Sequence, residues 1–274
     1  MSKPRRLVIR RPISGTTKII LGVVSILILF ALYELLSYRQ HTINPADTTI
    51  PSLTQMWGSL KKACSPDPLN HVWLLEDSKA TLMRFFLGLG VGVVLSIIIG
   101  IAMGCFQTVE AFCLPALSFF AKVPPTAMLA VFFVLVGMNL TMFITMIGFG
   151  VLPTLTQAIY QSAKYDVHEE LINKAYTLGA SNTEVILSVI LRQILPRIIE
   201  AVRLQVGPAM VFLIAAEWML ADVGFGYRLR IQSRLMNMGV VYVYIVLLGA
   251  FGFCVDRLLT RLRQWMCPWF DNTK

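Results

Sequence analysis

Residues 82–104 read LMRFFLGLGVGVVLSIIIGIAMG, a stretch in which Arg84 is the one charged residue. An α-helix of about 20 apolar residues is long enough to cross the hydrocarbon core of a lipid bilayer. The stretch is also rich in glycine, and small residues let helices approach closely in lipid, where hydrophobicity gives no drive for association. We therefore predict a transmembrane helix over Leu82–Gly104.

Five further apolar runs lie on either side of this stretch. The first of them follows a basic N-terminal segment, as in a signal peptide, but it is long, and the Ser-Tyr-Arg-Gln-His that follows is no small-residue cleavage site. We expect it to be retained as a helix. The runs are Ile19–Leu36, Phe112–Val136 with an interruption at Pro124-Pro125, Leu140–Ile159, a shorter Val206–Leu220, and Val240–Leu258.

The composition points the same way, because the chain is 56% hydrophobic and only 14% charged. A soluble domain carries about a quarter charged residues, so this chain has too little polar surface to cover a water-soluble globule. The predicted fold is therefore all-α: a polytopic transmembrane helical bundle of about six spans.

The formal net charge of +9 has two interpretations. A basic protein can bind nucleic acid, but in a membrane protein Lys and Arg accumulate on cytoplasmic loops because they resist translocation. With the N-terminus inside, the basic residues fall mostly on cytoplasmic segments, so we expect both termini in the cytoplasm and no nucleic-acid partner.

This topology divides the chain into four parts. We expect a short amphipathic helix around Ser52–Ala63 in the second part and a long cytoplasmic loop in the third. The parts are a cytoplasmic basic tail with the first transmembrane helix (1–38), a periplasmic loop (39–81), a five-helix core with the cytoplasmic loop 161–205 (82–265), and a cytoplasmic tail (266–274).

No catalytic or metal-binding pattern emerges from the sequence. The five cysteines show no CxxC spacing and the three histidines are scattered, so we predict no metal site, no structural disulfide and no catalytic residues. A GxxxxGK[ST] phosphate loop is also absent. Any ATP hydrolysis linked to this protein would therefore come from another chain.

The loop 161–205 predicts two short helices separated by glycine. Asp166 with Glu169 has the spacing of a capping box, Gly179 suits the left-handed geometry that ends a helix, and Ser181 or Asn182 can cap the next one. Pro196 is expected to break or kink the helix before the fifth span. An amphipathic helix held at the membrane surface can dock into a groove on a soluble partner or lie at the lipid interface.

This loop resembles the cytoplasmic EAA loop of ABC importer permeases. Its register is Asn173-Lys174-Ala175, then Gly179-Ala180-Ser181, then Leu195-Pro196. Other segments resemble the branch of the family that imports aliphatic sulfonates, taurine, nitrate and similar solutes: residues 100–104 (GIAMG), 123–127 (VPPTA), 216–218 (AEW) and 224–227 (GFGY). The resemblance covers roughly residues 50–265.

Three departures from the family pattern fall in this loop. Asn173 replaces the motif glutamate, Lys174 replaces its middle alanine, and Arg192 stands where a proline is often found. A charge contact with the partner is thereby put in doubt. Glu169 and Glu170 lie one helical turn earlier and can substitute for it.

The resemblance implies a type I importer permease in the bacterial inner membrane. It implies a homodimer around one path, working by alternating access for a small, anionic solute, with ATP and Mg bound by a separate ATPase and solute delivered by a periplasmic or lipid-anchored binding protein. The chain itself would carry no cofactor. An ATPase-independent channel or membrane scaffold remains the alternative. The residues expected to couple to the ATPase are Glu169, Glu170, Asn173, Lys174, Ala175, Leu178, Gly179, Ala180 and Ser181.

The same resemblance suggests a translocation path for the third and fifth spans. Glu217 is the one acid deep in an apolar run, where a carboxylate usually faces a cavity or a partner, so it either shapes the path or forms an ion pair with Arg84 or Lys122. Pro124 and Pro125 free backbone carbonyls that can line a path, and Gly224 and Gly226 follow the fifth span.

Three arginines after Gly226 run against the inside-positive bias. Arg228, Arg230 and Arg234 either draw an anion toward the pore mouth, contact an acidic surface of the binding protein, or are simply solvated.

Overall fold

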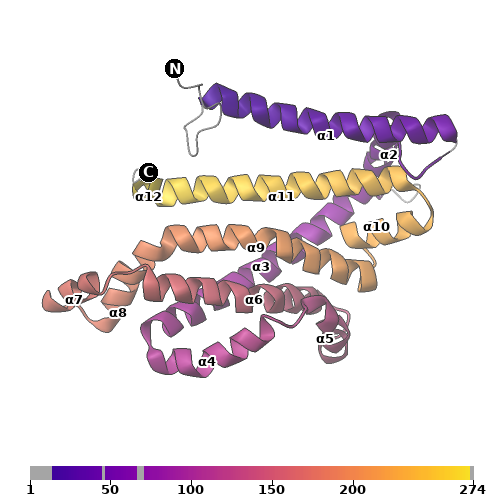
Figure 1. Ribbon diagram of the computed structural model, residues 1–274. Helices are drawn as coiled ribbons and strands as arrows, with labels where there is room; N and C mark the ends of the chain where they lie inside the picture. Colours follow the sequence, from indigo (N-terminus) through magenta and orange to yellow (C-terminus); the bar gives the residue numbers. More distant parts are fainter. Residues whose placement is uncertain (1–13, 45–46, 67–70, 272–274) are drawn as a thin grey trace, which may run out of the picture.

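The computed structural model describes residues 14–44, 47–66 and 71–271, and every regular element in these ranges is helical (Figure 1). Most of the basic N-terminal tail and the last residues of the C-terminal tail lie outside the described residues. Five helices are long and apolar enough to cross a membrane, or six if one bent pair counts as a single span. The predicted all-α transmembrane bundle is confirmed.

The first half of the described chain runs through α1 (Gly15–Ile43), α2 (Leu53–Cys64), α3 (Trp73–Cys105), α4 (Gln107–Phe120), the 3₁₀ turn η1 (Pro125–Met128) and α5 (Leu129–Val136). The second half comprises α6 (Leu140–Tyr165), α7 (Glu169–Thr177), α8 (Asn182–Glu184), the π-helical turn η2 (Val185–Ile190), α9 (Leu191–Leu220), α10 (Phe225–Arg234), α11 (Met238–Met266) and α12 (Pro268–Asp271).

The glycine-rich stretch packs directly onto α6, as its composition predicts. A Cβ added at Gly104 would lie 2.4 Å from the Cβ of Ala163, and one added at Gly88 would lie 2.7 Å from Cδ1 of Ile147. No larger residue fits at these positions without displacing the neighbour, so the glycines set the distance between α3 and α6. Around this pair α9 and α11 complete the bundle.

The helix that contains this stretch is longer than predicted. α3 begins at Trp73, nine residues before the expected start at Leu82, because Asp77 and Thr81 are buried and hydrogen-bonded inside the protein instead of being solvated in a loop. The segment before it holds α2, which begins with a capping box between Ser52 and Gln55. The short helix expected around Ser52–Ala63 is therefore confirmed.

The third apolar run is broken, as the adjacent prolines indicate. α4 ends at Phe120, and the following pair η1–α5 is turned by 85° relative to it. Residues 121–124, which include Lys122 and Pro124, form the connection between the two halves. Because this bend falls inside an apolar run, the two halves together form either one broken span or a re-entrant segment.

The segment 161–205, expected as a loop, holds α7, α8, η2 and the first half of α9. Residues Asn182–Leu220 form one continuous 39-residue helix, and Pro196 lies inside it without breaking it. The ring of Pro196 is buried in the bundle, and the π-helical turn η2 lies just before it. Packing and such local adjustments offset the hydrogen bond that a proline removes from a membrane helix. The fifth span is correspondingly longer than Val206–Leu220.

The ends of the helices sort to two ends of the bundle. In Figure 1 the start of α1, the pair α7–α8 and α12 lie at one end, and α2, α10 and α5 lie at the other. The apolar window of α1 has no buried residue. α1 is held near its C-terminal end, where the Tyr33 hydroxyl donates to the Pro51 carbonyl at 2.5 Å.

Candidate functional site

The short helix α7 follows α6 after a three-residue turn. We expected Asp166 to cap it, but His168 occupies the N-cap position and makes no side-chain cap. Asp166 still has a right-handed helical backbone at the end of α6, whereas an N-cap needs an extended one. Its carboxylate instead lies 3.0 Å from Nε of Arg197 on α9, so the predicted capping box of Asp166 and Glu169 is wrong.

The end of α7 is built as the glycine predicts. Gly179 has φ +85°, the Gly179 N–H donates to the Tyr176 carbonyl at 2.9 Å, and the Ala180 N–H donates to the Ala175 carbonyl at 3.1 Å. These two bonds are the Schellman motif that ends a helix with a left-handed residue. Ser181 then starts α8 through a capping box with Glu184, which confirms the first of the two predicted caps.

α7 has an inner and an outer face. Ile172, Ala175 and Ala180 pack against the hydrophobic core, whereas Leu178 at the tip is 88% exposed. Ala175 therefore lies half-buried on the inner face, and its role in coupling stays a prediction. The remaining predicted coupling residues are exposed: Glu169, Glu170, Asn173, Lys174, Gly179 and Ser181.

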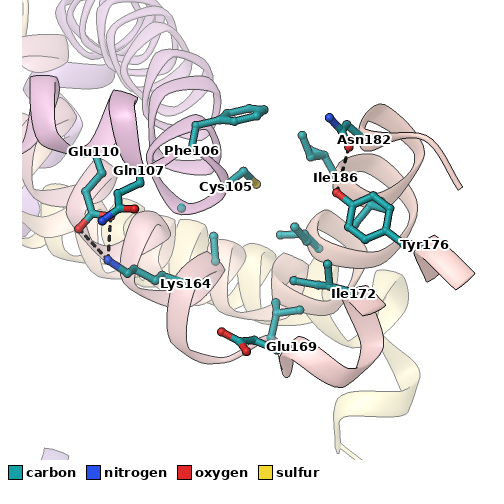
Figure 2. Close-up of a pocket in the computed structure, with 15 residues that line it drawn as sticks. Cys105, Phe106, Gln107, Glu110, Lys164, Glu169, Ile172, Tyr176, Asn182 and Ile186 are labelled. Carbon is teal, nitrogen blue, oxygen red and sulfur yellow. Dashed lines mark hydrogen bonds and ion pairs between the residues drawn. The ribbon is translucent and has the colours of Figure 1, made fainter. Parts of the chain in front are cut away.

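A cleft of about 420 Å³ separates α7 from the turn between α3 and α4 (Figure 2). On its inner wall the ammonium of Lys164 donates to both carboxylate oxygens of Glu110 at 2.7 Å, and the Tyr160 hydroxyl donates to the same carboxylate at 2.5 Å. On its outer wall the Tyr176 hydroxyl donates to the side-chain oxygen of Asn182 at 3.0 Å. Beyond the cleft, α7 packs mainly on η2.

The sequence interpretation did not single out these cleft residues. Glu110 and Lys164 each lie at the end of an apolar run, where charged residues are ordinary. The sequence does not show that Glu110 and Lys164 lie next to each other. Their contact depends on how α4 packs against α6.

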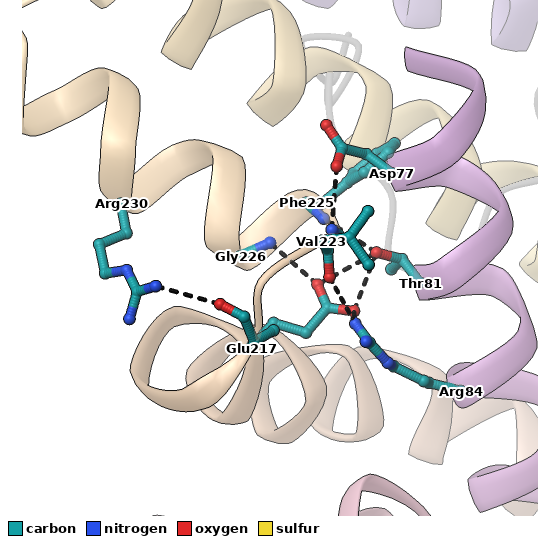
Figure 3. Close-up of polar contacts among 10 residues, drawn as sticks. Asp77, Thr81, Arg84, Glu217, Val223, Phe225, Gly226 and Arg230 are labelled. Carbon is teal, nitrogen blue, oxygen red and sulfur yellow. Dashed lines mark hydrogen bonds and ion pairs between the residues drawn. The ribbon is translucent and has the colours of Figure 1, made fainter. Parts of the chain in front are cut away.

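A second polar cluster is buried at the opposite end of the bundle (Figure 3). The Glu217 carboxylate is fully buried and lies 2.8 Å from Nη1 of Arg84. It also accepts hydrogen bonds from the Thr81 hydroxyl at 3.0 Å and from the Gly226 N–H at 2.9 Å. Of the partners that the sequence left open for Glu217, the structure has Arg84 and not Lys122.

Asp77 is a second fully buried carboxylate in this cluster. It accepts hydrogen bonds from Nε of Arg228 at 2.7 Å, from the Tyr244 hydroxyl at 2.8 Å and from the Gly224 N–H at 2.9 Å. The cluster thereby joins α3, α9, α10 and α11. The sequence interpretation missed Asp77 because the predicted span began after it. The spacing of Asp77, Thr81 and Arg84, which places them on one helix face, is the signal that could have found it.

Two glycines let the Glu217 carboxylate reach the start of α10. Gly224 has φ +126°, and a Cβ there would lie within 2.7 Å of the Glu217 carboxylate. A Cβ on Gly226 would lie 2.6 Å from the Ile214 carbonyl oxygen. The role of Gly224, Gly226 and Glu217 in a translocation path remains a prediction. The close packing at the two glycines already leaves no room for a side chain at either position.

The arginines after Gly226 lie on a helix and not in a loop. Arg228 is engaged with Asp77, and Arg230 donates to the carbonyls of Met219 at 2.9 Å and Ala221 at 3.0 Å. These guanidinium groups tie α10 to α3 and α9. Two of the three arginines proposed to draw an anion toward the pore mouth, Arg228 and Arg230, are therefore already engaged in contacts within the protein.

Comparisons with known proteins agree with this architecture. Residues 92–267 match the family model of the binding-protein-dependent transport system inner membrane component. A probable ABC transporter permease protein of Brucella melitensis is 32% identical over 196 residues, which cover 70% of this chain and 79% of that protein. The taurine transport system permease protein TauC of Escherichia coli is 27% identical over 225 residues, covering 82% of each chain.

A solved structure shows the same fold. The inward-facing MetNI methionine ABC transporter aligns with a TM-score of 0.57 and 16% sequence identity, covering 79% of this chain and 99% of that one.

Proposed function

The chain belongs to the family of inner membrane components of binding-protein-dependent transport systems, and we propose that two copies of it form the translocation path of an ATP-driven importer for a small anionic solute. In this family the permease is a non-catalytic, multi-pass inner-membrane subunit, and the ATPase is a separate chain. We place both termini in the cytoplasm, at the end of the bundle that carries α7.

The single observation that carries the proposal is the outer face of α7. A nearly fully exposed leucine at the tip of a short amphipathic helix, Leu178, fits an apolar groove on a soluble partner. Glu169 and Glu170 begin the helix and supply the acidic groups that Asn173 lacks. We infer that this face docks on the ATPase subunit, which binds ATP and Mg.

The substrate class rests on the relatives. Their names assign them taurine, aliphatic sulfonates and bicarbonate, each a small solute with an acidic group. A periplasmic or lipid-anchored binding protein would select and deliver the solute, so the permease needs to recognise little more than size and charge.

The proposed mechanism is alternating access. ATP closes the two ATPase subunits, and their movement displaces α7 in each permease copy. Because α8, η2 and α9 form one helix, the displacement reaches the buried cluster around Glu217 and Asp77. That cluster ties α9 to α3, α10 and α11, so these helices would move together and open the outer side.

The test is purification of the tagged chain from membranes of its own host, followed by reconstitution into nanodiscs. We expect an ATPase to co-purify and its MgATP hydrolysis to rise when solute-loaded binding protein is added. Leu178→Asp should abolish co-purification, because it puts a charge into an apolar contact, and Leu178→Met should preserve it as the matched control. A chain that purifies without any ATPase would support the channel or scaffold alternative.

A further inference from the structure

Lys122 occupies an unusual place for a cation. It lies in the connection between α4 and η1–α5, where the helical direction changes by 85° inside an apolar run. The Glu110–Lys164 pair lies at the first turn of α4, at the end of the bundle that we place in the cytoplasm. From Glu110 to the end of α4 at Phe120 the helix rises about 15 Å, half of the roughly 30 Å hydrocarbon core. The Lys122 backbone is therefore deep in the membrane.

The ammonium of Lys122 has no partner among the described residues. Its side chain is exposed in the single subunit, and no ion pair or hydrogen bond in the described chain involves it. Glu217, the acid that the sequence offered as its partner, is bound by Arg84. An ionisable residue at this depth almost always faces a partner, a water-filled cavity or a substrate route.

The neighbourhood of Lys122 along the chain is otherwise apolar. Thr126, four residues further on, lines a groove of about 490 Å³ between η1–α5 and the end of α9. The other walls of this groove are alanine, leucine, phenylalanine and methionine side chains, and no acidic residue lines it. Lys122 does not itself line this groove, but it lies only four residues before Thr126 in the chain. A single positive charge near an apolar path favours an anion over a cation or a neutral solute, because low-dielectric walls screen it weakly.

We propose that Lys122 is the anion-selecting group of the translocation path and contacts the acidic group of the passing solute. This assignment rests on the proposed function, since it presumes a path between the permease copies. It differs from the arginine cluster on α10, whose charges are largely used to hold that helix in place.

The experiment uses a cysteine at Thr126 as a reporter of local charge. The full chain, with its native cysteines replaced by alanine, is reconstituted with its ATPase subunits. Modification rates of Thr126→Cys are measured with two methanethiosulfonate reagents of similar size, one bearing a sulfonate and the other a trimethylammonium group. The ratio of the two rates is compared between Lys122, Lys122→Arg and two neutral variants, Lys122→Gln and Lys122→Met.

With Lys122 or Lys122→Arg, we expect the sulfonate reagent to be favoured relative to a free thiol in solution. Both neutral variants should lower the ratio by about three- to tenfold at low ionic strength, and by less in high salt. A cysteine at Ser65, which is exposed near the end of α2, should keep one ratio throughout as the matched control.

Two results would overturn the proposal. One is an unchanged ratio at position 126 in the neutral variants. The other is a cysteine at position 126 that reacts with neither reagent, both without nucleotide and with ATP and vanadate. Co-purification of the ATPase with the unmodified chain is scored separately, so a failure of the importer assignment is distinguished from a failure of the Lys122 assignment.

Discussion

At the scale of single residues, the buried pair Arg84–Glu217 shows how a charge is accommodated inside an apolar bundle. The carboxylate is fully buried, yet the guanidinium, a hydroxyl and a backbone N–H all donate to it. Two of these donors, Thr81 and Arg84, lie on α3, and the third is the Gly226 N–H in α10. Removing one partner leaves the other charge buried and unpaired. The free-energy cost of that unpaired charge is far larger than the net stabilisation that the intact pair contributes.

This predicts a specific pattern of stability. Arg84→Met alone should destabilise the protein by about 3–5 kcal/mol, and Glu217→Gln by less, because the amide still accepts from Thr81 or Gly226. The double variant Arg84→Met/Glu217→Leu should recover part of the loss. The measurement is the temperature at which the detergent-solubilised protein loses its monodisperse peak in size-exclusion chromatography. Additive losses in the double variant would show that the two residues are not coupled.

At the scale of elements, the turn between α7 and α8 is where the sequence was most informative. Gly179 and Ser181 have residue-specific backbone roles, a left-handed C′ position and an N-cap, which local chemistry determines. Asp166 was misassigned for the opposite reason, and Pro196 does not break the helix that contains it. α6 and α9 extend further than their apolar runs indicate, since tertiary packing sustains helix across residues that locally favour an end.

We predict that Gly179→Val distorts the turn between α7 and α8 and abolishes coupling to the ATPase, without unfolding the bundle. A Cβ at position 179 meets no neighbour within 4 Å, so the cost is purely the backbone strain of a β-branched residue at φ +85°. Gly179→Asn is the matched control, because asparagine tolerates this conformation. The Val variant should still insert and bind the ATPase, but loaded binding protein should no longer stimulate ATP hydrolysis. Full stimulation in the Val variant would remove α7 from the coupling route.

At the scale of the whole molecule, the apolar runs predicted the fold class and most of the spans. The third-span break followed from two adjacent prolines, and the close packing of a neighbouring helix on α3, though not the identity of that helix, followed from glycine content. The polar cluster could not be predicted, because it depends on which ends of α3, α9, α10 and α11 meet. Asp77 shares a helix face with Thr81 and Arg84, but Arg228 and Tyr244 are far from it in the sequence and no local pattern links them to it.

The expected topology is tested by labelling from one side of the membrane. Single cysteines at Ser14 and Ser181, in a background without native cysteines, should react with an impermeant reagent only from the cytoplasm, and one at Ser65 only from the periplasm. The reason is the excess of basic residues on the proposed inner side. Labelling of position 181 from the periplasm would reverse the orientation.

The unbroken helix Asn182–Leu220 has a geometric consequence. At 1.5 Å per residue its 39 residues extend about 58 Å, so a tilt of only about 5° about one end displaces the other end by about 5 Å. That shift is comparable to the pitch of the helix itself. A partner that tilts the α8 end of this helix would therefore need only a small rotation to displace Glu217, together with the helices that the buried cluster ties to it.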